Sequence, residues 1–120
     1  MKIGGVILLA GLLIAACVLA DAALVSYRRH ECIRNLSWID EAKQNWALEN
    51  GKKSSDTPTV ADLLVYANGH RDSAGDSFPT CPSGGTYTIN SLGQVPTCSV
   101  SGHAISRADH PYNYYLKFTN

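Results

Sequence analysis

The N-terminal apolar stretch constrains this chain more than any other feature. From Ile3 to Ala20 no residue is charged, and none is polar apart from Cys17. As an α-helix rising about 1.5 Å per residue, this stretch would be roughly 27 Å long, and roughly 34 Å if it continues to Val25. Both lengths match the hydrocarbon core of a bilayer, which is about 30 Å thick. The pattern therefore predicts a transmembrane anchor over residues 1–25. The residues expected to face lipid include Ile3, Val6, Leu9, Leu13, Ile14 and Val18.

Three other interpretations of the N-terminus stay open. Lys2, the apolar run and the small residue Ala20 are typical of a cleaved signal peptide, although the run exceeds the usual core of about 7–15 residues. The residues Ile14-Ala15-Ala16-Cys17 are similar to a lipoprotein signal, but apolar residues rather than a polar tether follow them. A buried helix of a soluble protein would need more chain than the roughly 95 residues that remain. A retained, single-pass anchor is the favoured interpretation.

The rest of the chain is short and carries no net charge. The 120 residues include 10 Lys and Arg against 10 Asp and Glu. Proteins that bind nucleic acids normally carry a surplus of positive charge that neutralises phosphates, so we expect no nucleic-acid partner. The roughly 95 residues outside the anchor suffice for one small domain, which would gain stability from a cross-link.

The anchor is expected to continue into a second, amphipathic helical stretch over residues 26–50. No proline precedes Pro58 and no glycine lies between Gly11 and Gly51, so nothing in between breaks a helix. Lys43 lies within the apolar stripe, where we expect its side chain to extend towards solvent, and Trp38 lies outside the stripe. Asn50-Gly51 is a helix stop. The residues of the stripe are Cys32, Leu36, Ile39, Trp46 and Ala47.

The remaining segments predict a small α+β head at residues 26–120. Thr59 and Asp62 have the spacing of a capping box, so we expect a short helix over 59–68. Residues 81–103 predict an antiparallel β-hairpin, with strands at 86–90 and 95–100 and a turn at 91–94. The tail at 104–120 is uncertain, because Tyr114 to Phe118 could add a third strand to the sheet or hang free.

Two of the four cysteines flank the predicted hairpin. Cys81 and Cys98 should lie close together, and a disulfide between them would stabilise the head by about 3 kcal/mol through loop closure. Free, packed thiols are one alternative. A zinc site is another, although no Cys-x-x-Cys pair is present to nucleate it. Such a site would combine Cys81, Cys98 and His103 with Cys32 or His70.

Catalytic signals are weak, and we expect neither an enzyme nor a cofactor. His30 and Cys32 could pair as base and nucleophile, but residues two apart on a helix point in different directions. The tail contains Ser, His and Asp without the strand-turn-helix context of a nucleophilic serine, and no phosphate-binding glycine loop occurs. Cys17 and Cys32 are expected to serve as packing residues.

The complete pattern resembles the bacterial type IV pilin-like proteins and the type II secretion pseudopilins. Besides the hydrophobic helix, the resemblance lies in CIRNLSWIDEAKQNWALENGK (32–52), DTPTVADLL (56–64), CPSGGTYTI (81–89) and CSVSGH (98–103). The resemblance implies a spine helix that packs in the membrane or in a filament core and carries a small outward-facing head. Prepilins are cut after a glycine and carry Glu at the fifth mature position. Here a cut after Gly5 would place Ala10 at that position, so the sequence departs from the family pattern at the cleavage site and at the Glu position.

The resemblance also implies a function and a location. We expect a non-enzymatic subunit of a type II secretion or type IV pilus-like apparatus, whose partners are the lipid bilayer and other pilin-like subunits. The alternative is an exported or lipidated small extracytoplasmic binding domain with no role in a filament. Lys2 before the anchor and Arg28 and Arg29 after it would by themselves place the head in the cytoplasm. The predicted disulfide outweighs this small charge bias and favours a bacterial inner-membrane protein with its C-terminal domain outside the cytoplasm.

Overall fold

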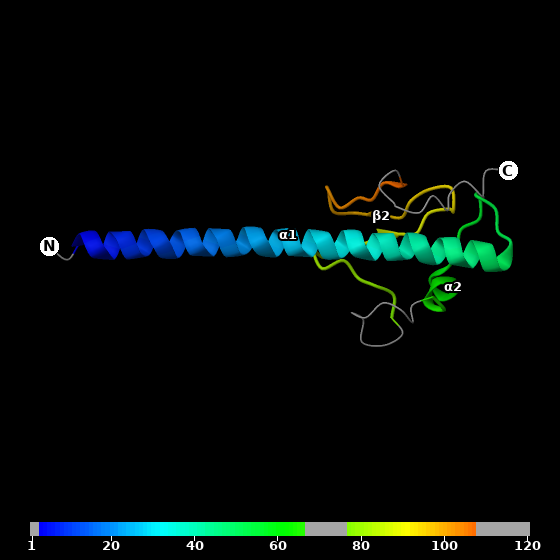
Figure 1. Cartoon of the computed structure of the whole chain (residues 1–120), viewed down its shortest axis with the longest axis horizontal. Coiled ribbons are helices and arrows are strands. Elements are labelled where there is room, and N and C mark those ends of the chain that lie inside the picture. Colours follow the sequence, from blue (N-terminus) through cyan, green and yellow to red (C-terminus); the bar gives the residue numbers. More distant parts are fainter. Residues whose placement is uncertain (1–2, 67–76, 108–120) are drawn as a thin grey trace.

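The computed structural model describes residues 3–66 and 77–107 of the chain. One long helix, α1 (Ile3–Asn50), is followed by a short helix, α2 (Val60–Leu64), and by two strands, β1 (Tyr87–Thr88) and β2 (Thr97–Cys98). The molecule measures 77 × 31 × 22 Å, and α1 forms its long axis (Figure 1). The predicted α+β arrangement, with one long N-terminal helix, a short helix and a small antiparallel sheet, is confirmed.

The helix α1 runs without a break past Asp21 and Arg29, over 48 residues. It ends where predicted, because Gly51 adopts a left-handed φ of 60° that residues with a side chain rarely adopt. The backbone N–H of Lys52 then donates to the carbonyl of Ala47 at 3.0 Å, which satisfies one of the last carbonyls of the helix.

The first half of α1 is apolar and uncovered. Figure 1 shows it projecting alone from the rest of the chain. Ile3 begins the helix, and the other predicted lipid-facing side chains are 61–67% exposed; these are Val6, Leu9, Leu13, Ile14 and Val18. The helix is long and apolar enough to cross a membrane.

The second half of α1 is the core of the head. All residues of the predicted stripe are buried: Cys32, Leu36, Ile39, Trp46 and Ala47. Burial extends well beyond a single stripe, and between residues 32 and 48 only Arg34, Glu41, Asn45 and Leu48 are exposed. The head therefore surrounds most of the circumference of the helix.

Two parts of the head hold α1 from different sides. In Figure 1, α2 lies on one side of α1 and β2 on the other, and both make contact with it. Trp38, which the predicted stripe did not include, meets the ring of Phe78 edge-to-face with centroids 6.0 Å apart. Leu63 of α2 joins the same apolar cluster. The sequence pattern showed only one buried face because it could not show that two segments dock on the helix.

The expectation for Lys43 was wrong. Its side chain is fully buried instead of extending to solvent. The Nζ atom donates to the backbone carbonyls of Ile89, Ser91 and Gln94 at 2.6, 2.9 and 2.7 Å, so it holds the hairpin turn against α1. Burial lowers the pKa of Lys43 to about 8.

The capping box at the start of α2 is confirmed. Thr59 Oγ1 accepts from the backbone N–H of Asp62 at 3.3 Å, and Asp62 Oδ2 accepts from the backbone N–H of Thr59 at 2.8 Å. The regular helix ends at Leu64, earlier than the predicted end at residue 68, which lies outside the described residues.

The hairpin is shorter than predicted. Only Tyr87 and Thr88 pair with Cys98 and Thr97, respectively, in an antiparallel register. The predicted turn is present, since the N–H of Gln94 donates to the carbonyl of Ser91 at 3.0 Å. Pairing stops early because Asn90 has a left-handed φ of 58° and Pro96 has no N–H to donate. The possible third strand at residues 114–118 lies outside the described residues.

Candidate functional site

Three cysteines and one histidine converge where the head begins to cover α1. The ligand-type atoms of Cys32, Cys81, Cys98 and His103 all lie within 4.8 Å of one another. From Gly4 onwards, Cys32 is the first buried residue of α1. The other three come from the loop before β1, from β2 and from the turn after β2. Residues far apart in the sequence thus meet at one point.

Two tight turns position the side chains that the head contributes. The N–H of Gly84 donates to the carbonyl of Cys81 at 3.0 Å, and the N–H of His103 donates to the carbonyl of Val100 at 3.2 Å. Gly84 and Gly102 both have a φ of 78°, a conformation that favours glycine. Each turn reverses the chain within a few residues and so returns its cysteine or histidine to the surface of α1.

The predicted Cys81–Cys98 disulfide is not formed. The two cysteines do lie side by side, but their Sγ atoms are 3.7 Å apart, and all four cysteines are free thiols. Cys81 Sγ also lies 4.0 Å from Nδ1 of His103. A disulfide would need the two sulfurs about 2.05 Å apart. The sulfur of Cys32 and the imidazole of His103 lie in the same small space.

Backbone N–H groups point at two of the sulfurs. The N–H of Val100 donates to Cys98 Sγ at 3.5 Å. Burial by itself would raise the pKa of the Cys81 thiol, but the backbone N–H groups of Ser83 and Gly85 stabilise its thiolate and lower the pKa to about 7. In both cases a donor comes from the residue two positions after the cysteine. The donors to Cys81 favour the charged form of its sulfur.

Cys32 has a more apolar environment than Cys81. Burial raises the pKa of the Cys32 thiol to about 12, and a hydrogen bond from Tyr87 opposes this effect. The Tyr87 hydroxyl accepts from Asn35 Nδ2 at 3.2 Å, which ties the site to the next turn of α1. Arg29 Nε donates to the carbonyl of Gly102 at 3.1 Å and brings a positive charge to the turn that carries His103.

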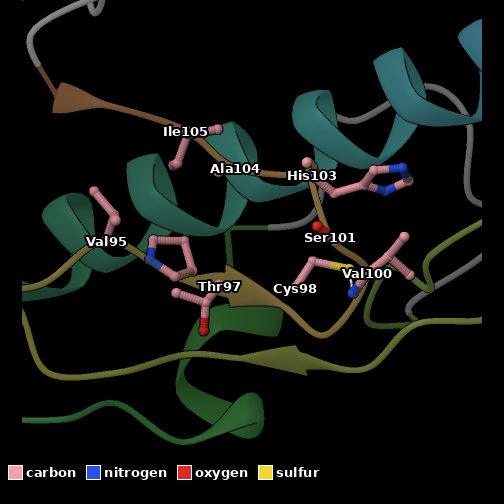
Figure 2. Close-up of a pocket in the computed structure, with 10 residues that line it drawn as sticks. Val95, Thr97, Cys98, Val100, Ser101, His103, Ala104 and Ile105 are labelled. Carbon is pink, nitrogen blue, oxygen red and sulfur yellow. Dashed lines mark hydrogen bonds between the residues drawn. The ribbon is translucent and has the colours of Figure 1, made fainter.

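The site adjoins a pocket of about 200 Å³ between β2 and the segment that follows it. Figure 2 shows this pocket with Cys98 and His103 among its lining residues, both projecting towards the same side. His103 is 8% exposed and Cys81 6% exposed, whereas Cys32 is fully buried. The cluster is therefore closed to all but small species.

The other residues that we considered for chemistry do not join a site. Cys17 is exposed on the first half of α1, and His30 is exposed whereas Cys32 is buried, so the two do not form a pair. Ser101 and Ser106 are exposed. His70, the alternative fourth ligand, lies outside the described residues, as do Asp109 and His110.

The sequence contains one local signal of the cluster. Cys98 and His103 are separated by four residues that include Gly102, a spacing short enough for a single turn to bring both side chains together. Both residues belong to the alternative zinc site expected from the sequence, and this Cys-x₄-His spacing adds a local signal to it. Cys32 carries no such signal, because its place in the site depends on which side of α1 the hairpin docks.

Comparisons with known proteins gave no match: no family model, no curated protein and no solved structure is similar to this chain.

Proposed function

We propose that this chain is a non-enzymatic, single-pass membrane protein that acts as a pilin-like or pseudopilin subunit of a type II secretion or type IV pilus-like apparatus. One observation supports the proposal most. A single unbroken helix has an uncovered apolar first half and a second half enclosed by a small head.

The uncovered half of α1 needs a partner. Leu13 and Leu19 are 67% and 70% exposed. Burying a large apolar side chain fully gains about 1.5–3 kcal/mol relative to leaving it in water, so this half of the helix is unfavourable in water. Lipid covers such a helix in the membrane, and helices of neighbouring copies cover it in a bundle. Because the helix continues into the head without a break, the same subunit could be held by lipid in the membrane or by neighbouring helices in a bundle.

The proposal places the protein in the bacterial inner membrane with the head outside the cytoplasm. A disulfide does not support this orientation, because Cys81 and Cys98 are free thiols. The orientation follows instead from the resemblance to pilin-like proteins, against the small charge bias of Arg28 and Arg29. A C-terminal alkaline phosphatase fusion, which is active only outside the cytoplasm, tests it. An inactive phosphatase fusion together with a fluorescent green-fluorescent-protein fusion would place the head inside.

Membrane fractionation tests the anchor. We expect the chain to stay in the membrane after an alkaline wash, and a freely soluble product would contradict the proposal. The mass of the mature N-terminus separates the other possibilities. An intact Met1 supports the anchor and Val6 a processed prepilin, whereas Asp21 or an acylated Cys17 would favour the exported or lipidated binding domain.

Cys17 provides a test of assembly. It is exposed within the uncovered half of α1, so a membrane-permeant bismaleimide should join the Cys17 thiols of neighbouring copies if these helices bundle. The matched control is Cys17→Ser, in which the cross-linked dimer should disappear. A wild-type protein that remains monomeric at native expression would contradict assembly through this helix.

A further inference from the structure

We propose that Cys32, Cys81, Cys98 and His103 form a structural zinc site that fastens the head to α1. The set of three cysteine sulfurs and one imidazole is one of the ligand sets of four-coordinate structural zinc sites. The proposal does not rest on the pilin-like function, because it uses only the geometry of the head.

The distances fit a tetrahedral zinc ion. With Zn–S bonds of about 2.3 Å and a Zn–N bond of about 2.0–2.1 Å, two sulfurs of a tetrahedral site lie about 3.8 Å apart, and a sulfur and a nitrogen about 3.6 Å apart. The Sγ atoms of Cys81 and Cys98 are 3.7 Å apart, and Cys81 Sγ is 4.0 Å from His103 Nδ1. All four ligand atoms lie within 4.8 Å of one another, so shifts of at most about an ångström would complete the coordination.

The surroundings of the sulfurs also fit a metal site. Zinc binds thiolates, and ligands of structural sites usually accept hydrogen bonds from outer groups that hold them in place. Val100 supplies a backbone N–H to Cys98, Ser83 and Gly85 supply N–H groups to Cys81, and Tyr87 donates to Cys32. Backbone donors of this kind stabilise negative charge on a sulfur. A cysteine that packed as a neutral, apolar side chain would not require them.

The site is closed, which indicates a structural rather than a catalytic role. Four protein ligands would leave no coordination position for water or substrate. Cys32, Cys81 and His103 are all buried, and Cys98 is half-buried. Three thiolates and Zn²⁺ would together carry one negative charge, and Arg29 places a positive charge at the adjacent carbonyl of Gly102.

The position of the site gives it a mechanical consequence. Cys32 lies at the start of the covered half of α1, next to the uncovered half. The strands β1 and β2 have only two residues each, so their ladder contributes little rigidity. One zinc ion would tie α1, the loop before β1, the end of β2 and the following turn together, as small domains with limited cores often require.

Metal analysis of the full chain in mild detergent tests the proposal. The protein is purified with a reductant, supplied with zinc, dialysed and analysed by inductively coupled plasma mass spectrometry. We expect one zinc ion per chain. A natively folded wild-type protein that retains no zinc would overturn the proposal. A Cys81–Cys98 disulfide, mapped by mass spectrometry in protein purified without reductant, would also overturn it.

Two cysteine variants distinguish a zinc site from a pair of thiols. If Cys32 is a ligand, Cys32→Ser should lose the zinc. If the hairpin residues alone formed the site, Cys32→Ser would retain it. The matched control is Cys17→Ser, which should retain one zinc ion because Cys17 lies on the uncovered half of α1. Undiminished zinc retention in Cys32→Ser would overturn the four-ligand site.

Cobalt keeps the test valid if a variant does not fold. Co²⁺ added to the wild-type protein should give the intense visible bands of tetrahedral coordination and thiolate-to-metal charge-transfer bands in the near ultraviolet. His103→Cys should retain tetrahedral cobalt and gain charge-transfer intensity, because it replaces the imidazole with another thiolate. A weak octahedral spectrum in the wild-type protein would overturn the proposal. Since none of these readouts depends on assembly, and Cys17 cross-linking does not depend on the metal, either proposal can fail without the other.

Discussion

Replacing Lys43 with methionine should destabilise the head by about 3 kcal/mol. Lys43→Met removes the donor of three part-buried hydrogen bonds, those to the carbonyls of Ile89, Ser91 and Gln94. Leaving each unsatisfied costs about 2 kcal/mol, or about 6 kcal/mol together. The substitution also removes a buried charge. The pKa of Lys43 falls from 10.5 to about 8, which means that the folded head disfavours the charged lysine by about 3 kcal/mol. Removing this unfavourable charge offsets about half of the 6 kcal/mol.

Tryptophan fluorescence during urea unfolding measures this effect. The chain has two tryptophans, Trp38 and Trp46, and both are buried in the head, so the signal reports the head even when α1 remains in detergent. The matched control is Lys53→Met, since Lys53 is exposed and should change stability by less than about 0.5 kcal/mol. A Lys43→Met head as stable as the wild type, or more stable, would refute the reasoning. It would mean that apolar packing replaces the buried charge without loss.

The pH dependence of stability gives a second readout for Lys43. Between about pH 8 and pH 10.5 the unfolded chain binds a proton at this lysine that the folded head does not bind. The free energy of unfolding of the wild type, relative to Lys43→Met, should therefore rise with pH through this window. Asp40, which favours the charged lysine, and Arg107, which opposes it, are the charged groups that act on Lys43. A flat difference across the window would contradict the lowered pKa.

Three further predictions concern other parts of the head. Hydrogen bonds from Thr59 lower the pKa of Asp62, so the ionised Asp62 stabilises the head near neutral pH and this contribution is lost as the pH falls below about 3.8. Thermal unfolding followed across this range should therefore show a smaller loss of stability on acidification in Asp62→Asn than in the wild type. Gly85→Ala would place a Cβ atom 2.8 Å from Cys98 Sγ, so we expect a loss of about 1–3 kcal/mol in urea unfolding together with reduced zinc retention. Leu36→Ala should lose about 2–5 kcal/mol because Leu36 is fully buried, whereas Leu48→Ala, at a site 49% exposed, should change urea unfolding far less.

Local patterns in the sequence predicted most of the elements. The apolar run, the absence of Pro before Pro58 and of Gly between Gly11 and Gly51, and the Asn50-Gly51 stop predicted one long helix. Each of these signals depends only on residues that are close together in the sequence. The capping box of Thr59 and Asp62 and the turn at 91–94 were predicted for the same reason. Strand lengths were less accurate, because Asn90 and Pro96 end the pairing early.

The contacts of Lys43 and Trp38 could not be predicted from the sequence. A lysine within an apolar stripe usually extends to solvent, and only the docked hairpin turn surrounds Lys43 with carbonyls. The approach of Phe78 from another side of α1 buries Trp38. In each case the partner lies more than 35 positions away in the sequence, so helical periodicity carries no information about it.

The sequence by itself determined that this chain has an apolar helix long enough for a membrane, continuing into a head with Cys81 and Cys98 close together. Helix formation and hairpin closure depend on neighbouring residues, which is why they can be read from residue order. Only the tertiary structure decided that Cys32 and His103 join those cysteines and that no disulfide is formed. The physical reason is that the docking angle of the hairpin on α1 sets this convergence, and that angle results from packing across the whole head.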